Sequence, residues 1–485
     1  MTKVKQNRVV VSEQELLSMD ASTLAKKIAN QEITSKHATS VFISHLKKVN
    51  HVLNGLVEDR FEQALREAEK ADAEIKQNGA GHKKLLGVPM SMKESFDVAE
   101  MKTTGGLIHR KHIVRKQDSH VVTALKAEGA IFLGKTNTPT LCFCQETDNK
   151  LYGRTNNPWD LTKTTGGSSG GEGALLAVGG AAAGIGSDIG GSIRFPSHFN
   201  GVIGFKSGNR QVSQVGSFPP IDIDLQERML GIGPMTKSVA DAKMLYNIIA
   251  KKPAEAKDLS RFTMTILPRT NYPMSDETEN MLVMIQKQLQ DEYETMKAVP
   301  PFFDQCAILW QEIMSVDGGQ GIAEITFGAD KSNAVTEYMK EVVTGKSDVH
   351  RFLSWALIGA NLFKPSEKRV QEINHYLAKG DEQLEDYLDE RILFFPVYHT
   401  SALKHGRVYK EIFSIRKTFL KYMPYVAYAN VWGLPSLTIP IQTDKQNMPI
   451  GVQLMSKNGN EDALFQIGEW LESRNRGYIR CMNYD

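Results

Sequence analysis

The stretch from residue 163 to residue 206, KTTGGSSGGEGALLAVGGAAAGIGSDIGGSIRFPSHFNGVIGFK, constrains the fold more than any other part of the sequence. Its glycines come mostly in pairs, and the pairs bracket serines or short apolar runs. A glycine inside a helix or strand costs roughly 0.5–1 kcal/mol relative to alanine, so this density indicates close backbone approach or positive φ. A solvated Gly/Ser linker would lack the apolar runs at 174–178 and 181–185. The stretch therefore predicts a buried site lined by backbone.

Serines lie among these glycines at two points. Ser168 and Ser169 stand between two Gly-Gly pairs, and Ser192 directly follows a third pair. A hydroxyl flanked by glycines can be reached by a substrate, and the neighbouring peptide N–H groups can point at a developing oxyanion. The pattern favours nucleophilic chemistry by a serine.

Length, composition and charge exclude several classes of protein. At 485 residues the chain exceeds the usual size of one core, so length alone predicts two or three domains, although large α/β enzymes break that rule. The formal net charge is +2, from 58 basic and 56 acidic side chains without a long block of one sign. We therefore expect no nucleic-acid partner and no surface for anionic membranes.

The cysteines indicate neither a disulfide framework nor a metal site. Cys142, Cys144, Cys306 and Cys481 are too few and too scattered for disulfides in a chain of this length. A zinc site would need a second pair of ligands to match Cys142 and Cys144. We expect buried structural cysteines in a reducing compartment, with no metal and no cofactor.

The first eighty residues are expected to be helical. Ser12 and Glu15 match a capping box, and apolar residues recur at helical spacing between positions 38 and 49. His45 lies on that apolar face and is interpreted as a packed histidine. The N-terminus lacks the apolar core of a signal peptide, and no run of about 18 apolar residues occurs. This predicts a cytoplasmic protein without a transmembrane segment.

A lysine closes an apolar strand pattern in the segment LLGVPMSMK. The period-two alternation places Val88, Met90 and Met92 on one face and Ser91 with Lys93 on the other. Burial disfavours an ammonium and promotes the neutral amine, which can act as a general base near neutral pH. An edge-strand lysine that reaches solvent fits the pattern equally well. The residues alone leave both interpretations open.

One segment matches a nucleotide-binding formula. Residues 129–136, GAIFLGKT, fit GxxxxGK[ST]. In a phosphate-binding loop the strand precedes the first glycine, whereas AIFL here has the composition of the strand itself. The Thr138-Pro139 step is also a poor start for the helix that must follow. We therefore do not expect nucleotide binding.

A second formula match concerns Ser168. Residues 166–170, GGSSG, fit the GxSxG nucleophile elbow of α/β-hydrolases, in which Ser168 would pair with a histidine. An elbow needs a strand leading into it, and residues 160–165, DLTKTT, are polar and typical of a turn. Local support for this esterase interpretation is weak. The downstream histidines are His198, His350, His375, His399 and His405.

Taken in order, Lys93, the serine pair and Ser192 resemble the amidase signature family. The similarity extends through GVPMSMKESF, GRTNNPWDLTKTTGGSSGGEGAL and GIGSDIGGSIRFPSHFNGVIGFK to GIGPMTKSVADAKMLYNII, NVWGLPSLTIPI and MPIGVQLM. It covers roughly residues 15–250 and 420–475. Within the family, the segments GRTNNP and SDIGGSIRFP are most similar to the fatty acid amide hydrolase branch.

The resemblance implies a catalytic role for each of three residues. Ser192 would be the nucleophile. Ser168 would be the bridging serine, whose preceding peptide bond is cis in the family. Lys93 would be the neutral base that takes the proton through Ser168 and returns it to the leaving amine.

The resemblance also implies an oxyanion hole and supporting residues. Ser169 would be a supporting residue, and Arg194 would organise the site rather than perform chemistry. Glu172 and Asp188 are candidate hydrogen-bond acceptors. The oxyanion hole would consist of the backbone N–H groups of Ile189, Gly190, Gly191 and Ser192.

The fold that the resemblance implies is α/β, a single large domain with a mixed twisted sheet covered by helices. We expect residues 1–80 to pack as a helical segment on a catalytic domain of residues 81–485, with a variable helical region at about 255–420. Apolar clusters in that region, such as FLSWALI at 352–358, are interpreted mostly as buried helix faces.

The function that the resemblance implies is hydrolysis of an acyl or aryl amide to acid and amine through an acyl-enzyme. The partner would be a small-molecule amide, and a homodimer is one compatible assembly. Two alternatives are a glutamine-dependent amidotransferase component that supplies ammonia to a partner, and a catalytically silent binding protein on the same scaffold.

Overall fold

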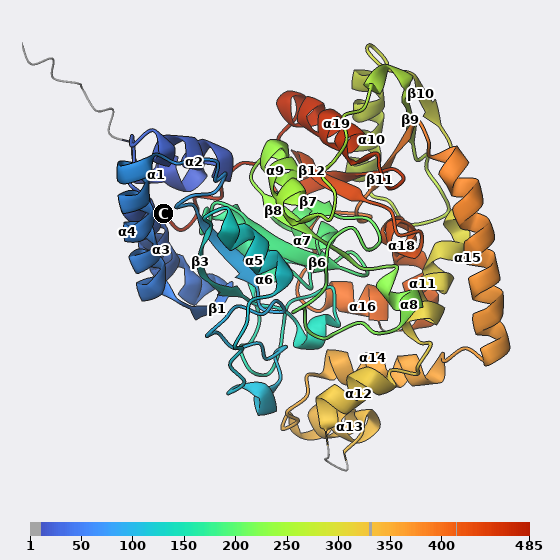
Figure 1. The fold of residues 1–485 in the computed structure, drawn as a ribbon. Helices are drawn as coiled ribbons and strands as arrows, with labels where there is room; N and C mark the ends of the chain where they lie inside the picture. The colour runs from blue at the N-terminus through green and yellow to red at the C-terminus, as the bar shows by residue number, and fades with distance from the viewer. Residues whose placement is uncertain (1–10, 329–331, 414) are drawn as a thin grey trace, which may run out of the picture.

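A mixed β-sheet forms the centre of the molecule (Figure 1). The computed structural model describes residues 11–328, 332–413 and 415–485. In this part of the chain the main sheet has eight strands, in the spatial order β10 (Thr295–Lys297), β9 (Thr263–Ile266), β11 (Arg391–Pro396), β13 (Pro449–Met455), β12 (Ser436–Thr443), β7 (Ile203–Lys206), β8 (Gly231–Thr236) and β6 (Gly184–Asp188). β10, β9 and β11 run parallel, and the remaining neighbours pair antiparallel. The predicted α/β fold with a mixed sheet is confirmed.

A smaller sheet continues from the β6 edge of the main sheet. Its strands lie in the order β1 (Leu56–Asp59), β3 (Ile131–Thr136) and β2 (Pro89–Lys93). The N–H of Ser91 donates to the carbonyl of Ala183, and the N–H of Ala182 donates to the carbonyl of Pro89, both at 3.0 Å. The chain entering β6 therefore covers the free edge of β2. Every residue of β2 is buried, so the interpretation of an edge lysine that reaches solvent is wrong.

Four N-terminal helices pack beside the small sheet (Figure 1). They are α1 (Glu13–Ser18), α2 (Ala21–Ala29), α3 (Ser35–Leu53) and α4 (Phe61–Asn78). The side chain of Ser12 accepts a hydrogen bond from the N–H of Glu15, which confirms the predicted N-terminal cap. His45 is buried on α3 and its Nε2 lies 2.8 Å from the carbonyl oxygen of Val178. His45 is therefore a packed histidine, as predicted.

Further helices cover the main sheet. α9 packs on β8 and α19 packs on β12, while α7 packs on β12 and β13. In α7 every side chain is buried, because this short helix lies within the core. These covering helices are α5 (His120–Ala127), α6 (Gly170–Ala177), α7 (Arg194–Asn200), α9 (Val239–Ile249), α18 (Pro424–Val431) and α19 (Glu461–Arg474).

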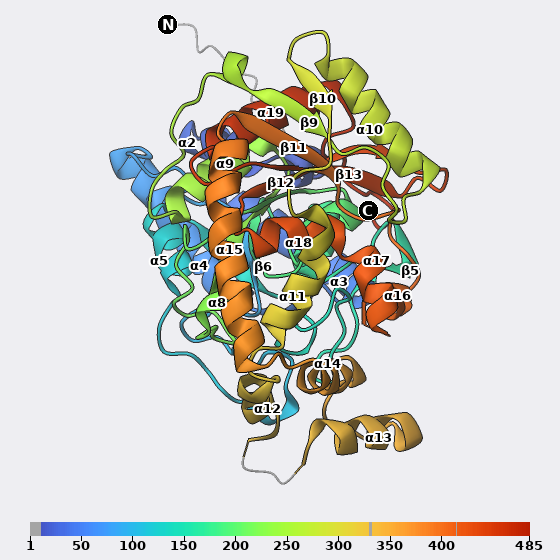
Figure 2. The ribbon, with the colours of Figure 1, turned by 90° about the vertical axis from the view of Figure 1, so that its right-hand side faces the viewer.

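Most of the remaining helices come from the segment between residues 270 and 423. Figure 2 shows α11 and α15 in front of the sheet, with α12, α13 and α14 below it. None of the described helices is both long enough and apolar enough to span a membrane. These helices, with α8, are α8 (Asp224–Glu227), α10 (Asp276–Leu289), α11 (Cys306–Met314), α12 (Gln320–Phe327), α13 (Ala334–Thr344), α14 (Arg351–Leu362), α15 (Glu367–Tyr387), α16 (Arg407–Phe413) and α17 (Arg416–Tyr422).

Candidate active site

Lys93 and Ser168 meet in the interior of the protein. Lys93, the last residue of β2, is fully buried, and its Nζ donates to the Ser168 hydroxyl at 2.7 Å. The same nitrogen lies 2.9 Å from the Ser187 hydroxyl and 3.3 Å from the Ser187 carbonyl. The peptide bond between Gly167 and Ser168 is cis, as the family resemblance predicts. The contact of β2 with β6 thus places the lysine beside two hydroxyls.

The surroundings of Lys93 favour its neutral form. Burial lowers the pKa of Lys93 from its ordinary value, although the Cys142 thiol beside it and the more distant Asp188 and Glu172 carboxyls oppose the shift. Burial raises the pKa of Glu172 to about 8, despite its hydrogen bond with the Ser91 hydroxyl at 2.6 Å. Glu172 is therefore mostly protonated at neutral pH and supplies little negative charge to hold a proton on Lys93.

The glycines of the serine-rich segment allow its backbone to pack tightly. A Cβ atom on Gly171 would lie 2.4 Å from the backbone nitrogen of Asn137, a distance that no side chain can occupy. Ser169 precedes α6, and its N–H donates to the carbonyl of Ser192 at 3.1 Å. This bond joins the two serine-bearing loops directly.

The loop that precedes Ser192 is held through its carbonyl groups. The indole N–H of Trp310 donates to the Ile189 carbonyl at 2.7 Å, and the side-chain amide of Gln145 donates to the Gly190 carbonyl at 3.0 Å. The N–H of Gly191 donates to Asp188 at 2.8 Å and is already engaged. The N–H groups of Ile189, Gly190 and Ser192 have no acceptor within the described ranges, and all three residues line a cavity.

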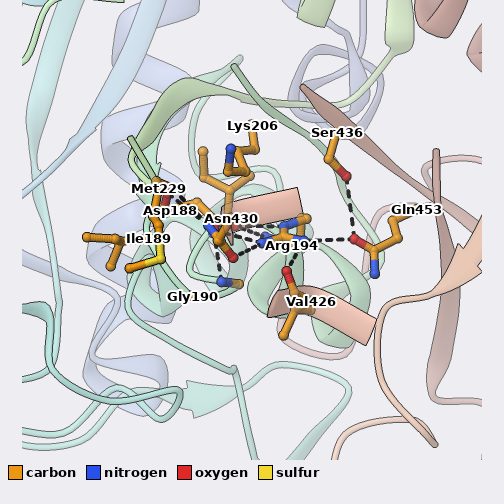
Figure 3. Close-up of polar contacts among 12 residues, drawn as sticks. Asp188, Ile189, Gly190, Arg194, Lys206, Met229, Val426, Asn430, Ser436 and Gln453 are labelled. Atoms are coloured by element: carbon orange, nitrogen blue, oxygen red, sulfur yellow. Dashed lines mark hydrogen bonds and ion pairs between the residues drawn. The ribbon is translucent and has the colours of Figure 1, made fainter. Parts of the chain in front are cut away.

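A buried ion pair anchors this loop to the C-terminal part of the chain (Figure 3). Asp188 and Arg194 are both fully buried, and two guanidinium nitrogens lie 3.0 Å from the two carboxylate oxygens. Arg194 also donates to Gln453 and to the Val426 carbonyl, each at 2.9 Å, and to Asn430. All of these partners fix the position of Arg194.

The charge of Arg194 determines the ionisation of Asp188. Burial alone would raise the pKa of Asp188, but the Arg194 guanidinium, with Lys206 and Asn430 nearby, holds it well below its usual range. The ionised carboxylate accepts from the backbone N–H of Ile193 as well as from that of Gly191. Asp188 therefore shapes the turn on which Ser192 lies.

A cavity of about 460 Å³ opens beside Ser168, Ser187 and Ser192. Its wall is mainly apolar and comes largely from helices of the 255–420 region. Of the cluster at 352–358, Phe352, Leu353, Ser354 and Leu357 are buried, as predicted. Trp355, Ala356 and Ile358 instead line the cavity. Other lining side chains are Leu230, Trp310, Met314, Phe363 and Phe419.

The two competing motifs fail on geometry. Residues 131–136 form β3, so the Gly-Lys-Thr of the phosphate-loop formula lies within a strand, as the composition predicted. The turn predicted before Ser168 is wrong, because Asp160–Thr164 forms strand β5, which pairs with β4 (Asn156–Asn157). The partner of Ser168 is nevertheless a lysine. His198 contacts the carbonyls of Thr400 and Gly451 instead, and no described histidine bonds to Ser168 or Ser192.

Several residues of the site were missed by sequence reasoning. Ser187 has a recognisable neighbourhood, since it stands in GSDIGGS directly before the glycine pair. Gln145 and Trp310 carry no local signal, because only the fold brings them to the loop. Cys142 was predicted to be a buried structural residue; its side chain is half-buried, lines the cavity and lies beside Lys93.

Comparisons with known proteins agree with this site. The family model described as Amidase matches residues 37–465. Fatty-acid amide hydrolase 2-B of Danio rerio is 32% identical over 96% of this chain and 91% of its own length. Fatty-acid amide hydrolase 2 of Homo sapiens is 30% identical over 96% and 90%. The A component of the glutamyl-tRNA(Gln) amidotransferase of Prochlorococcus marinus (strain MIT 9215) is 28% identical over 94% and 98%.

Solved structures share the fold at lower identity. The structure of 6-aminohexanoate cyclic dimer hydrolase complexed with substrate matches 97% of this chain and 100% of its own, with a TM-score of 0.80 and 21% identity. Fatty acid amide hydrolase matches 96% of this chain and 86% of its own, with a TM-score of 0.79 and 20% identity. Fold and relatives together define an amide hydrolase. The chain belongs to the amidase family, as the sequence resemblance predicted.

Proposed function

We propose that this enzyme cleaves its amide substrate through a Ser192-Ser168-Lys93 relay and an acyl-enzyme. The observation that carries the proposal is the 2.7 Å hydrogen bond between Lys93 and Ser168, fully enclosed within the protein. A buried lysine whose pKa is lowered, paired with a hydroxyl beside a cavity, is the arrangement expected of a general base acting through a bridging serine.

The relay moves one proton in each direction. The Ser192 hydroxyl attacks the amide carbonyl and passes its proton to Ser168, which passes its own to neutral Lys93. The ammonium then returns a proton through Ser168 to the leaving nitrogen, so that the C–N bond breaks and an ester on Ser192 remains. Water hydrolyses that ester by the same relay. Within the described residues Ser168 and Ser192 are not hydrogen-bonded, so a side-chain rotation must join them.

The developing oxyanion would be stabilised by three backbone donors. The N–H groups of Ile189, Gly190 and Ser192 are unengaged within the described part of the chain, whereas Gly191 donates to Asp188. Each such donor is typically worth about 2.7–4 kcal/mol in the transition state. We therefore assign the oxyanion hole to these three groups and give Gly191 a structural role.

The cavity supports a substrate with an extended apolar part. Its wall is built mainly of aromatic and aliphatic side chains, and two relatives are named fatty-acid amide hydrolases. We propose an acyl or aryl amide as the substrate class, with a fatty-acyl amide as the first to test. The helical segment 1–80 on a catalytic domain 81–485, the homodimer and the cytoplasmic location remain predictions.

The decisive experiment is to treat the purified protein with a fluorophosphonate and to map the adduct by peptide mass spectrometry. We expect labelling of Ser192, lost in Ser192→Ala, together with turnover of acyl p-nitroanilides. An adduct on Ser168 that depends on a histidine would overturn the relay. Glutamine hydrolysis that rises on addition of an amidotransferase partner, without turnover of acyl amides, would support the amidotransferase alternative instead.

A further inference from the structure

The cavity beside Ser192 carries two charged side chains among the described residues that line it, Asp317 and Arg416. The carboxylate of Asp317 already accepts hydrogen bonds from the backbone N–H groups of Gly319 and Gly321, at 2.9 and 3.0 Å. Asp317 therefore has partners within its own turn, and Arg416 is the charged group whose pairing is incomplete.

Arg416 is positioned but not neutralised. It is the first residue of α17, and its guanidinium lies over the ring of Phe363 with 5.0 Å to the ring centroid. Among the described residues no carboxylate forms an ion pair with it, and its buried Nε has no hydrogen-bond partner. By contrast, the guanidinium of Arg194 is held by Asp188, Gln453 and Asn430. A partly enclosed guanidinium with free donors is suited to receive an anion from outside the protein.

A continuous series of contacts connects Arg416 to the catalytic loop. Phe419 lies three residues further along α17, on the same side of the helix as Arg416, and both line the cavity. The ring of Phe419 packs against Trp310 with 5.5 Å between centroids. Trp310 in turn donates to the carbonyl of Ile189. One apolar wall therefore extends from the residues preceding Ser192 to the guanidinium.

We propose that Arg416 binds a carboxylate at the far end of the substrate, so that the enzyme prefers amides in which an apolar chain separates the scissile bond from an anionic group. The proposal rests on the proposed function for the position of the scissile amide. A guanidinium presents its donors as a planar fork that matches a carboxylate in a bidentate manner, and aromatic stacking holds that plane in place. The apolar wall between the two ends accommodates the methylene chain.

The test compares substrates that differ only in the terminal group. Mono-p-nitroanilides of hexanedioic, octanedioic, decanedioic and dodecanedioic acids are each paired with the fatty-acyl p-nitroanilide of the same chain length. The measured quantity is the ratio of kcat/KM within each pair. We expect the ratio to favour the carboxylated substrate by about tenfold or more at one or more lengths, and Arg416→Met to bring it close to one. Arg416→Lys, which keeps the charge but not the fork, should retain an intermediate ratio.

Lys417→Met is the matched control. Lys417 follows Arg416 on α17, is exposed and does not line the cavity, so this variant removes the same charge from the same helix. It should keep the wild-type ratio. A ratio near one for the wild-type enzyme at every length, or a preference that survives Arg416→Met, would overturn the assignment.

A binding measurement separates this inference from the proposed function. Trp310 and Trp355 line the cavity, so tryptophan fluorescence can report binding of dodecanedioic acid against dodecanoic acid without catalysis. Tighter binding of the diacid that is lost in Arg416→Met would support the anion site even if the p-nitroanilides were not cleaved. Equal binding of the two acids, together with turnover of the plain substrates, would leave the proposed function intact and refute the role of Arg416.

Discussion

The indole nitrogen of Trp310 donates a hydrogen bond to the backbone carbonyl of Ile189 at 2.7 Å. The same ring packs so closely on Gly190 that a Cβ atom there would lie 2.7 Å from an indole carbon. α11, in the region not covered by the family resemblance, therefore fixes the peptide plane between Ile189 and Gly190. Because the N–H of Gly190 belongs to that plane, Trp310 orients a proposed oxyanion donor.

Replacing Trp310 with phenylalanine should impair the transition state more than substrate binding. The ring would still cover Gly190, but the bond that fixes the peptide plane would be lost. We expect kcat to fall about tenfold, with a smaller change in KM, because a misaligned donor weakens oxyanion stabilisation. Affinity for a trifluoromethyl ketone inhibitor, which forms a tetrahedral adduct, should fall in parallel with kcat.

Trp355→Phe serves as the comparison. Trp355 also lines the cavity, but its indole donates to the Phe413 carbonyl, away from the oxyanion loop. Its effect should appear mainly in KM. If both tryptophan variants changed kcat and inhibitor affinity alike, the special role of Trp310 would be wrong.

The acylation rate should fall as pH is lowered, because the relay needs neutral Lys93. Burial lowers the pKa of Lys93 below the ordinary lysine value of 10.5, and protonation of the amine below that pKa removes the base. Pre-steady-state release of p-nitroaniline at a series of pH values would locate the inflection. An acid limb that is absent in the wild-type enzyme would contradict the role of Lys93.

Glu172 also titrates near this range, with a pKa raised by burial to about 8, so its contribution must be separated. In Glu172→Gln the acid limb should persist, since Lys93 remains. If the limb disappears in this variant, the observed ionisation belongs to Glu172 instead.

Ser168→Ala should slow acylation strongly, by about 10²- to 10⁴-fold, because no hydroxyl would connect Lys93 to the nucleophile. Ser169→Ala is the adjacent control. The Ser169 hydroxyl lies 3.5 Å from the Ser187 carbonyl, a weak contact, so its loss should cost less than about tenfold. Fluorophosphonate labelling rates of the two variants provide the measurement. Equal labelling rates would argue against a bridging serine.

The sequence predicted the parts of the site that lie within contiguous motifs. Lys93, Ser168 and Ser192 stand in segments that resemble the family, and the apolar alternation before Lys93 is visible in the residues themselves. The depth of Lys93 could not be decided, because it depends on Ala182 and Ala183 covering the edge of β2 about ninety residues later in the chain. Local periodicity describes one strand and not what lies against its edge.

Gln145, Trp310 and Arg416 were not predicted as site residues for a similar reason. Each comes from a segment whose composition is that of an ordinary loop or amphipathic helix, and only tertiary packing brings it to the cavity. β5 was missed because its polar residues match a turn, whereas hairpin pairing with β4 supplies its hydrogen bonds. The sequence thus identified the chemistry but not the residues that orient and select the substrate.

The pair of Asp188 and Arg194 should contribute to stability as well as to the position of Ser192. Both side chains are fully buried, so Arg194→Met would leave an unpaired carboxylate in the core. We expect a loss of about 3–5 kcal/mol in the free energy of unfolding, measured by urea denaturation. The surface pair of Arg210 with Asp224, 50% and 92% exposed, provides the control, because Arg210→Met should cost less than about 1 kcal/mol. Similar losses in the two variants would show that the buried pair does not hold the loop; a large loss in Arg194→Met alone, with weaker fluorophosphonate labelling of Ser192, would tie stability and catalysis to the same contact.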